Sequence, residues 1–322
     1  MAVMGNFVLM ALVLGGLLFF SLLTAFVNNF IYFPLLFFAV LGFLFRYAKE
    51  LKEKIIPKIS REDLLLILCV LGGTVITFLL NNHLELGSII PAALVGLVAA
   101  LFAGKKAGPI YCGAFVGMAC QEVSGTFYSI LLAGLLAGGL FVLNKNHFNG
   151  FGGKLGILAF TGCLVVFFLR GEEFSSLIIE GSRLKWMIVF YSVLGAVLTY
   201  FGSFRLNQGP VLSSALTGLV GGIILPSIFP EVGLLLAGAM FCGAFVGMSS
   251  PERLPNEGFI VIAAIFAGIF FVYSSSYLGG TGGKLGAIAF ISTIGVRGLA
   301  DLYLQFWVPY RTKVVSLLLK NL

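Results

Sequence analysis

The pentapeptide Gly-Gly-Lys-Leu-Gly occurs twice in this chain, and its residue types fit the binding of an anion. Each copy precedes an apolar segment that we expect to be a helix, and a helix N-terminus offers free backbone N–H groups and about half a positive charge. A lysine adds a full charge. The alternative is that each lysine lies at a membrane interface and extends its ammonium group to water. The two copies supply six candidate substrate-binding residues: Gly152, Gly153, Lys154, Gly282, Gly283 and Lys284.

A longer phrase, Cys-Gly-Ala-Phe-Val-Gly-Met, is present at Cys112–Met118 and again at Cys242–Met248. Its glycines are four residues apart, so they lie on one helix face and allow another backbone to approach closely. This spacing predicts helix packing, and a direct role in lining or gating a permeation path is the second interpretation. The candidate residues for that role are Cys112, Gly113, Gly117, Cys242, Gly243 and Gly247.

Two carboxylates, Glu122 and Glu252, follow the two cysteines by ten residues. A carboxylate at the edge of a membrane is normally solvated, and Pro251 and Pro255 beside Glu252 are typical of a loop. If both carboxylates lie inside the membrane instead, they mark an ion or proton pathway, because ionisable groups are costly there. Both are therefore candidates for proton or ion coupling.

Other chemistry is poorly supported by the residue pattern. The five cysteines have no Cys-x-x-Cys spacing, and His83 and His147 lie in expected loops without repeat equivalents, so we expect no metal and no cofactor. Cys112 and Cys242 could meet as a redox pair, although two thiolates are half of the usual four ligands of an iron–sulfur cluster. The chain has no Gly-x-Ser-x-Gly, His-Glu-x-x-His or Walker motif, so we expect neither an enzyme nor a nucleotide site.

The repeated phrases belong to a longer internal duplication. Cys242 lies 130 residues after Cys112, and the same offset superposes the two glutamates and the two lysines. Upstream the offset is 122, which matches Thr199 with Thr77, so the second copy carries an eight-residue insertion around Ile224 to Gly233. Identity over seven- and five-residue blocks in one register indicates two homologous repeats.

The composition places these repeats in a lipid bilayer. Of the 322 residues, 59% are hydrophobic and only 10% are charged, with a mean hydropathy of +1.08. Crossing about 30 Å of hydrocarbon takes about 20 apolar residues in a helix, whereas a β-barrel would have short alternating strands. The apolar segments are Phe7–Val27, Phe30–Phe45, Leu64–Leu80, Ser88–Ala103, Thr126–Leu143, Leu155–Leu169, Trp186–Phe201, Val211–Ile228, Val232–Met248, Phe259–Tyr273, Leu285–Ile294 and Leu302–Leu319.

We therefore expect an all-α polytopic membrane protein with about 10–12 transmembrane segments. Its predicted parts are a two-helix extension with a basic linker (1–62), a first five-segment repeat (63–170), a connecting loop (171–185), a second repeat (186–298) and a C-terminal helix or tail (299–322). Five crossings per repeat would invert the second copy. The segment Ala107–Cys120 is short enough for a re-entrant half-helix, which would make the copies parallel; we expect inversion.

Positive residues set the expected orientation. Arg46, Lys49 and the other basic residues up to Arg61 crowd the linker before the first repeat, which we expect on the cytoplasmic side, here of a bacterial inner membrane. Because topology explains the net charge of +7, we expect no nucleic-acid partner. The expected partners are the lipid bilayer and a small-molecule or ion substrate, with a possible homo-oligomer.

Duplicated membrane folds commonly carry solutes, because a site forms where the broken helices of both halves meet. We expect a channel or secondary transporter for a small anion or polar solute, with its site between the repeats. The first alternative is a non-transporting scaffold or anchor subunit, in which the 33 phenylalanines and the basic linker pack against other chains. The second is a membrane redox carrier that uses Cys112 and Cys242.

Overall fold

The computed structural model describes residues 2–28, 32–52, 60–84 and 87–307, and their regular secondary structure is helical. Within these ranges the only strand-like pairing is one antiparallel bridge between Ser175 and Gly279. The chain begins with α1 (Ala2–Asn28) and α2 (Phe33–Lys52). The next helices are α3 (Arg61–Leu84), α4 (Ile89–Phe102), η1 (Gly104–Lys106), α5 (Ala107–Gly117), α6 (Gln121–Ser124), α7 (Phe127–Leu143) and α8 (Lys154–Arg170). The remaining helices are α9 (Ser182–Tyr200), η2 (Phe201–Arg205), α10 (Pro210–Ile228), α11 (Gly233–Gly247), α12 (Glu257–Ser274), α13 (Lys284–Leu302) and η3 (Tyr303–Trp307).

Long apolar helices mark the chain as an integral membrane protein. Six helices in the described residues are long and apolar enough to cross a bilayer, and α4, α7 and α11 are shorter apolar helices. A helix suits hydrocarbon because it satisfies its backbone hydrogen bonds internally. Large apolar side chains also point outward, such as Phe102 at 84% and Leu169 at 80% exposure. The expected all-α membrane class is confirmed.

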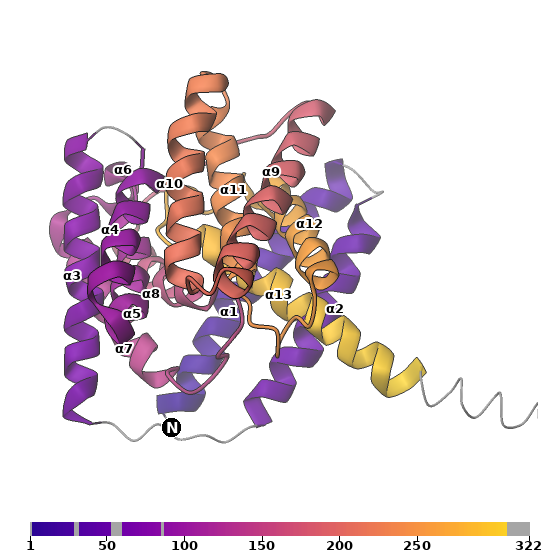
Figure 1. The fold of residues 1–322 in the computed structure, drawn as a ribbon, viewed down its shortest axis with the longest axis horizontal. Helices are drawn as coiled ribbons and strands as arrows, with labels where there is room; N and C mark the ends of the chain where they lie inside the picture. The colour runs from indigo at the N-terminus through magenta and orange to yellow at the C-terminus, as the bar shows by residue number, and fades with distance from the viewer. Residues whose placement is uncertain (1, 29–31, 53–59, 85–86, 308–322) are drawn as a thin grey trace, which may run out of the picture.

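The helices pack in two similar sets (Figure 1). In the first set α3 packs against α4, α5 and α7, and in the second α9 packs against α10, α11 and α12. α8 likewise contacts α5 and α7, while α13 contacts α11 and α12. Between the sets, α4 packs against α10 and α8 against α13. Figure 1 shows α3 running upward from its first residue and α9 running downward.

Glycines of the repeated heptapeptide allow the central helix of each set to approach its neighbour. A Cβ atom at Gly113 would collide with the carbonyl oxygen of Val70 on α3. A Cβ atom at Gly243 would collide in the same way with the carbonyl oxygen of Ser192 on α9. This backbone contact is the packing that the glycine spacing predicts.

The eight-residue insertion lengthens two helices of the second set. α10 has 19 residues where α4 has 14, and α11 has 15 where α5 has 11. The turn between α10 and α11 lies at residues 229–232, inside the predicted insertion. In Figure 1 the joined ends of α10 and α11 therefore project at the top of the molecule.

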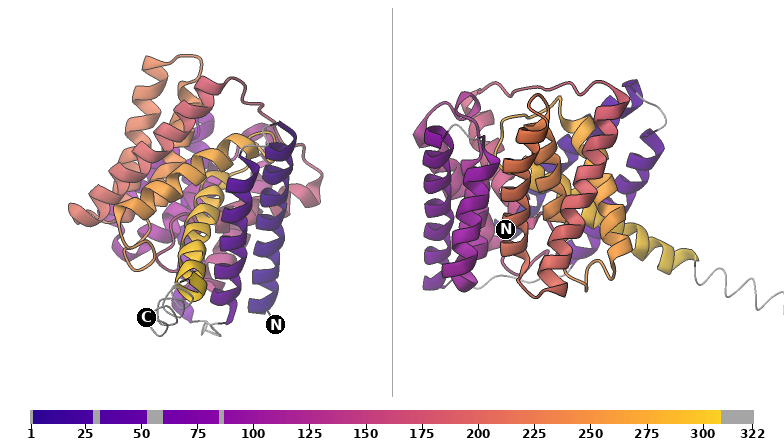
Figure 2. Two further views of the ribbon diagram at one scale, coloured as in Figure 1. Left: turned by 90° about the vertical axis from the view of Figure 1, so that its right-hand side faces the viewer. Right: turned by 45° about the horizontal axis from the view of Figure 1, so that its top comes forward.

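The N-terminal hairpin packs beside α13. The left view of Figure 2 shows α1, α2 and α13 side by side, in agreement with the contacts of α2 with α1 and α13. The basic linker predicted at 46–61 begins inside α2, whose helix continues to Lys52 because Arg46 and Glu50 are buried in ion pairs. Residues 53–59 of that linker lie outside the described residues. The predicted C-terminal segment Leu302–Leu319 lies outside them from residue 308 onward.

Candidate functional site

The two Gly-Gly-Lys-Leu-Gly segments lie against each other at the centre of the molecule. Gly153 and Gly283 adopt left-handed backbone conformations, with φ of 81° and 82°, directly before α8 and α13. A Cβ atom at Gly153 would collide with the backbone of α13, and one at Gly283 with the backbone of α8. A Cβ atom at Gly156 would strike the Cα atom of Gly286, and the reverse also holds. We call this contact the glycine crossing.

The two helices overlap at the glycine crossing through their first turns and run in opposite directions. Gly153 at the start of α8 lies against Phe290 of α13, and Gly283 at the start of α13 lies against Phe160 of α8. The contacts are therefore reciprocal, as expected for two copies of one element related by a two-fold axis. Both lysines stand beside this axis, each at the start of its helix.

Four aromatic side chains, here named the aromatic plug, pack next to the crossing. Phe115 and Phe245, the phenylalanines of the repeated heptapeptide, have ring centroids 4.7 Å apart. Tyr111 packs against Phe115 with ring centroids 4.3 Å apart, and Phe241 packs against Phe245 at 4.4 Å, both in tilted geometry. All four are among the largest fully buried side chains. Aromatic packing of this kind closes the space between α5 and α11.

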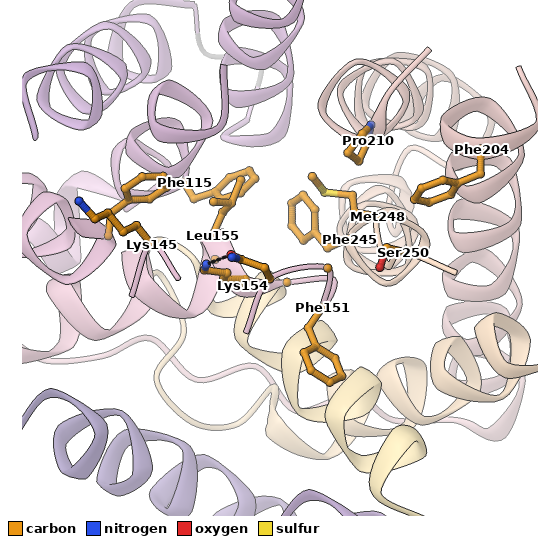
Figure 3. A pocket seen from close by; sticks show the side chains of 15 residues that line it. Phe115, Lys145, Phe151, Lys154, Leu155, Phe204, Pro210, Phe245, Met248 and Ser250 are labelled. Atoms are coloured by element: carbon orange, nitrogen blue, oxygen red, sulfur yellow. Dashed lines mark hydrogen bonds between the residues drawn. The ribbon is translucent and has the colours of Figure 1, made fainter. Parts of the chain in front are cut away.

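Cavity A, of about 350 Å³, lies on one side of the plug and contains Lys154 (Figure 3). Figure 3 shows Lys154 near the middle, with Phe115 and Lys145 on one side and Phe245 and Met248 on the other. The half-buried Lys154 donates a 2.5 Å hydrogen bond from Nζ to Oδ1 of Asn149. Among the described residues, no carboxylate oxygen lies within the 4.0 Å of an ion pair with this ammonium group.

The other cations at cavity A are held by carboxylates. Lys145 Nζ contacts both carboxylate oxygens of Asp63, at 2.8 and 2.9 Å. Arg253 donates to Glu50 at 2.7 Å and to the carbonyl oxygen of Asn149 at 2.8 Å. Its guanidinium carbon also lies 4.5 Å from the centre of the Phe151 ring, a cation–π distance. These contacts fix the loop that carries Asn149.

Glu50 is the centre of a buried ionic network behind this loop. It is 2% exposed and accepts from both Arg46, at 2.5 Å, and Arg253. Arg46 also binds Asp301 of α13 at 2.7 Å. The network joins α2, α13 and the loop after α11, so the N-terminal hairpin is fastened to the wall of cavity A. Buried charges of this kind are tolerated because each has an opposite partner.

Cavity B, of about 400 Å³, contains Lys284 and has a different lining. Its lining includes four serines, Ser175, Ser176, Ser274 and Ser275, beside apolar residues such as Leu235, Phe271 and Ile288. The Lys284 ammonium donates to two backbone carbonyl oxygens, those of Ser274, at 2.6 Å, and of Tyr277. Its hydrogen-bonding capacity is thus largely used by the main chain.

The two cavities lie at opposite ends of α9. Cavity A is lined by Phe204 and Pro210, which follow the C-terminus of α9, and cavity B by residues 175–177, which precede its N-terminus. α9 has 19 residues and is about 28 Å long. The cavities share no lining residue; Gly153 and Gly156 of the glycine crossing line cavity A, and Lys284 and Leu285 of the second repeated segment line cavity B.

The remaining predicted site residues lie elsewhere. Cys112 and Cys242 are fully buried free thiols whose nearest acceptors are the carbonyl oxygens of Leu155, at 3.3 Å, and Leu285, at 3.2 Å. Gly113, Gly117, Gly243 and Gly247 face α3 or α9 and are absent from the linings of both cavities. The described residues contain no group of three or more His, Cys, Asp or Glu side chains that could hold a metal.

The two candidate coupling carboxylates are not equally described. Glu252 is exposed in the turn between α11 and α12, where a hydrogen bond from the Ser250 side chain holds the pKa of its carboxyl below the usual value. Glu122 lies in the short helix α6, and its side chain is outside what the structure describes. Glu252 is therefore a solvated carboxylate, as the loop interpretation expects.

Sequence reasoning missed the aromatic plug and the Glu50 network. The plug had a signal, because the repeated heptapeptide contains Phe115 and Phe245, and aromatic residues precede both by four positions. Arg253 and Glu50 are 203 residues apart, and nothing local in the sequence pairs them. No protein-family model, curated protein or solved structure matches this chain.

Proposed function

We propose that this chain is a channel or secondary transporter for a small anion or polar solute, with its site at the interface of two pseudo-symmetric repeats. The observation that carries the proposal is the pair of lysine-containing cavities at opposite ends of α9, which share no lining residue, with the glycine crossing between the helices that carry the lysines and the aromatic plug beside cavity A. A solute that enters from either end would meet one ammonium group before it reaches the closed centre.

Inversion of the repeats is part of this proposal. It is supported by the opposite directions of α3 and α9 in Figure 1 and by the reciprocal contacts at the glycine crossing. Adding α2, α4, α5, α7, α8 and α11 to the six long helices makes twelve segments, as in a five-plus-five architecture with two further helices at the N-terminus. α5 has 11 residues, or about 16 Å, and inversion requires it to count as the third crossing of its repeat, so it would be surrounded by protein rather than by lipid.

The orientation that we propose places cavity A at the cytoplasmic side of a bacterial inner membrane. The support is the gathering of basic residues at this end: Lys145 lines the cavity, Arg253 binds its loop, and Arg205 follows α9 on the same side. Cytoplasmic loops carry such an excess of Lys and Arg. Cavity B would then face the opposite compartment.

The aromatic plug would serve as the barrier between the two compartments. Phe115 and Phe245 are each 2% exposed, so no water-filled path leads between them in this conformation. Movement of solute then requires either displacement of the two rings or a shift of α5 and α11, which carry them. A transporter has to close one cavity when it opens the other. The reciprocal contacts between α8 and α13 at the glycine crossing would allow both halves to move about the same helix–helix contact.

Reconstitution into liposomes tests the function directly. Purified protein is expected to accelerate the entry of nitrate or acetate, measured by stopped-flow light scattering, and Lys154→Ala is expected to lower the rate at least tenfold. Lys105→Ala is the matched control, because Lys105 is an exposed lysine of η1 outside both cavity linings. Flux equal to that of protein-free liposomes for every anion and polar solute tried would overturn the proposal.

A closed centre also fits the alternative of a non-transporting scaffold subunit. The cavities share no lining residue, and the plug between them is buried. A scaffold needs no permeation path, so its plug would be ordinary core. This alternative predicts a stable partner that co-purifies in fixed ratio, together with the absence of flux in the liposome experiment.

A further inference from the structure

The wall of cavity A is mostly apolar, although the cavity contains a lysine. Phe115, Phe141, Phe204 and Phe245 contribute aromatic rings, and Leu155 and Met248 add aliphatic surface. A small hydrated anion such as chloride would lose water against these side chains without gaining hydrogen bonds from them, which is costly. An anion with an apolar body would instead bury that body against them.

Two charged side chains line cavity A, and only one of them has a carboxylate partner. Lys145 is paired with Asp63, whereas Lys154 is held by the neutral amide of Asn149. A solute with one negative charge would balance the site, and a second negative charge would lie buried without a partner. Asn149 accepts from Lys154 through its oxygen, so its amide nitrogen stays available to donate to a carboxylate.

The volume restricts the size of the solute. At about 350 Å³, cavity A is near the lower end of ligand pockets, which run from about 300 to 1,000 Å³. This space suits a single ring or a short branched chain and is too small for a nucleotide or a long acyl chain.

We propose that cavity A binds a compact monocarboxylate with an apolar or aromatic body, an inference that rests on the transport function proposed above. The carboxylate contacts the Lys154 ammonium and the Asn149 amide, and the apolar body packs against the faces of Phe115 and Phe245 that line cavity A. In this position the solute touches both rings of the plug, so its binding is coupled to the element that separates the two compartments.

The experiment compares five ligands on the purified full-length protein in nanodiscs, by isothermal titration. Benzoate is the matching probe, benzamide lacks the charge, phthalate has a second carboxylate, and acetate and chloride lack the apolar body. Benzoate is expected to bind at least tenfold more tightly than each of the other four. Lys154→Ala is expected to weaken benzoate binding at least tenfold, while Lys105→Ala, at an exposed lysine outside both cavity linings, leaves it within twofold.

The outcomes separate this inference from the function. Acetate or chloride binding as tightly as benzoate overturns the amphipathic class, and phthalate binding as tightly overturns the charge count, yet anion flux in liposomes would still support transport. Benzoate binding without flux of any anion, benzoate included, supports the site and overturns transport. The ligand comparison on the unmodified protein decides the inference even if Lys154→Ala fails to fold.

Discussion

Cavity A and cavity B are built from equivalent segments but hold their lysines differently. Lys154 contacts the side-chain amide of Asn149, whereas Lys284 is held by the backbone carbonyl oxygens of Ser274 and Tyr277. The cause lies at one position, because the equivalent of Asn149, 130 residues later, is Gly279, which has no side chain to accept the bond. The two segments share the backbone conformation that begins α8 and α13, while their lysines have different hydrogen-bond partners.

Both repeated segments meet at the glycine crossing. An alanine substitution in either segment is therefore expected to cause a large loss of stability, and the two losses are expected to be equal. Gly156→Ala and Gly286→Ala each push a Cβ atom into the opposite backbone, and each is expected to cost about 3 kcal/mol or more, because neither helix can move away from the other. Yield and Tm in detergent measure the effect. Gly139→Ala in α7 is the control, since nothing lies within 4 Å of its Cβ position. A clearly different fall in Tm between Gly156→Ala and Gly286→Ala would contradict the equivalence of the two segments at the crossing.

Alanine substitutions of the two lysines are expected to affect different properties: mainly flux for Lys154 and mainly thermal stability for Lys284. Lys154→Ala removes a charge that faces a solute cavity and is expected to lower anion flux ten- to a hundredfold, the value of about 1.5–3 kcal/mol for a charged hydrogen bond. Lys284→Ala leaves two carbonyl oxygens unpaired and is expected to lower Tm by several degrees with a smaller change in flux. Flux and Tm of both variants are compared side by side. Equal flux losses would show that the cavities act alike.

The helix packing and the pairing of the two lysines could be predicted from the sequence, whereas the differences between the two cavities could not. Helix packing by Gly113 and Gly243 follows from spacing on one helix face, and the offset of 130 pairs Lys154 with Lys284. The partners of these lysines could not be predicted, because they depend on where loop residues lie in space. The partnership of Arg253 with Glu50 joins segments 203 residues apart, and only the packing of α2 against α13 brings them together.

Substitutions in the aromatic plug are expected to change flux less than Lys154→Ala does. Phe115→Ala and Phe245→Ala each remove a ring from the pair that separates the cavities and are expected to raise passive flux several-fold, with a fall in Tm from the lost core packing. Tyr111→Phe keeps the ring and loses only the 3.1 Å hydrogen bond with Ser214, so its flux is expected to stay unchanged. Reduced flux in both alanine variants would contradict the barrier role and leave the two rings only their contact with the solute.

Glu252→Gln is expected to have the smallest effect, because Glu252 lies beside cavity A without lining it. The Ser250 hydrogen bond lowers the pKa of Glu252, so its carboxyl is ionised at neutral pH and takes up a proton only in acid. A carboxyl with a lowered pKa stabilises the fold above its unfolded pKa and loses that contribution as the pH falls through the folded value. The pH profile of flux between pH 6 and 8 is therefore expected to be the same in Glu252→Gln and the unmodified protein. A profile that loses its slope in the variant would make Glu252 a coupling group.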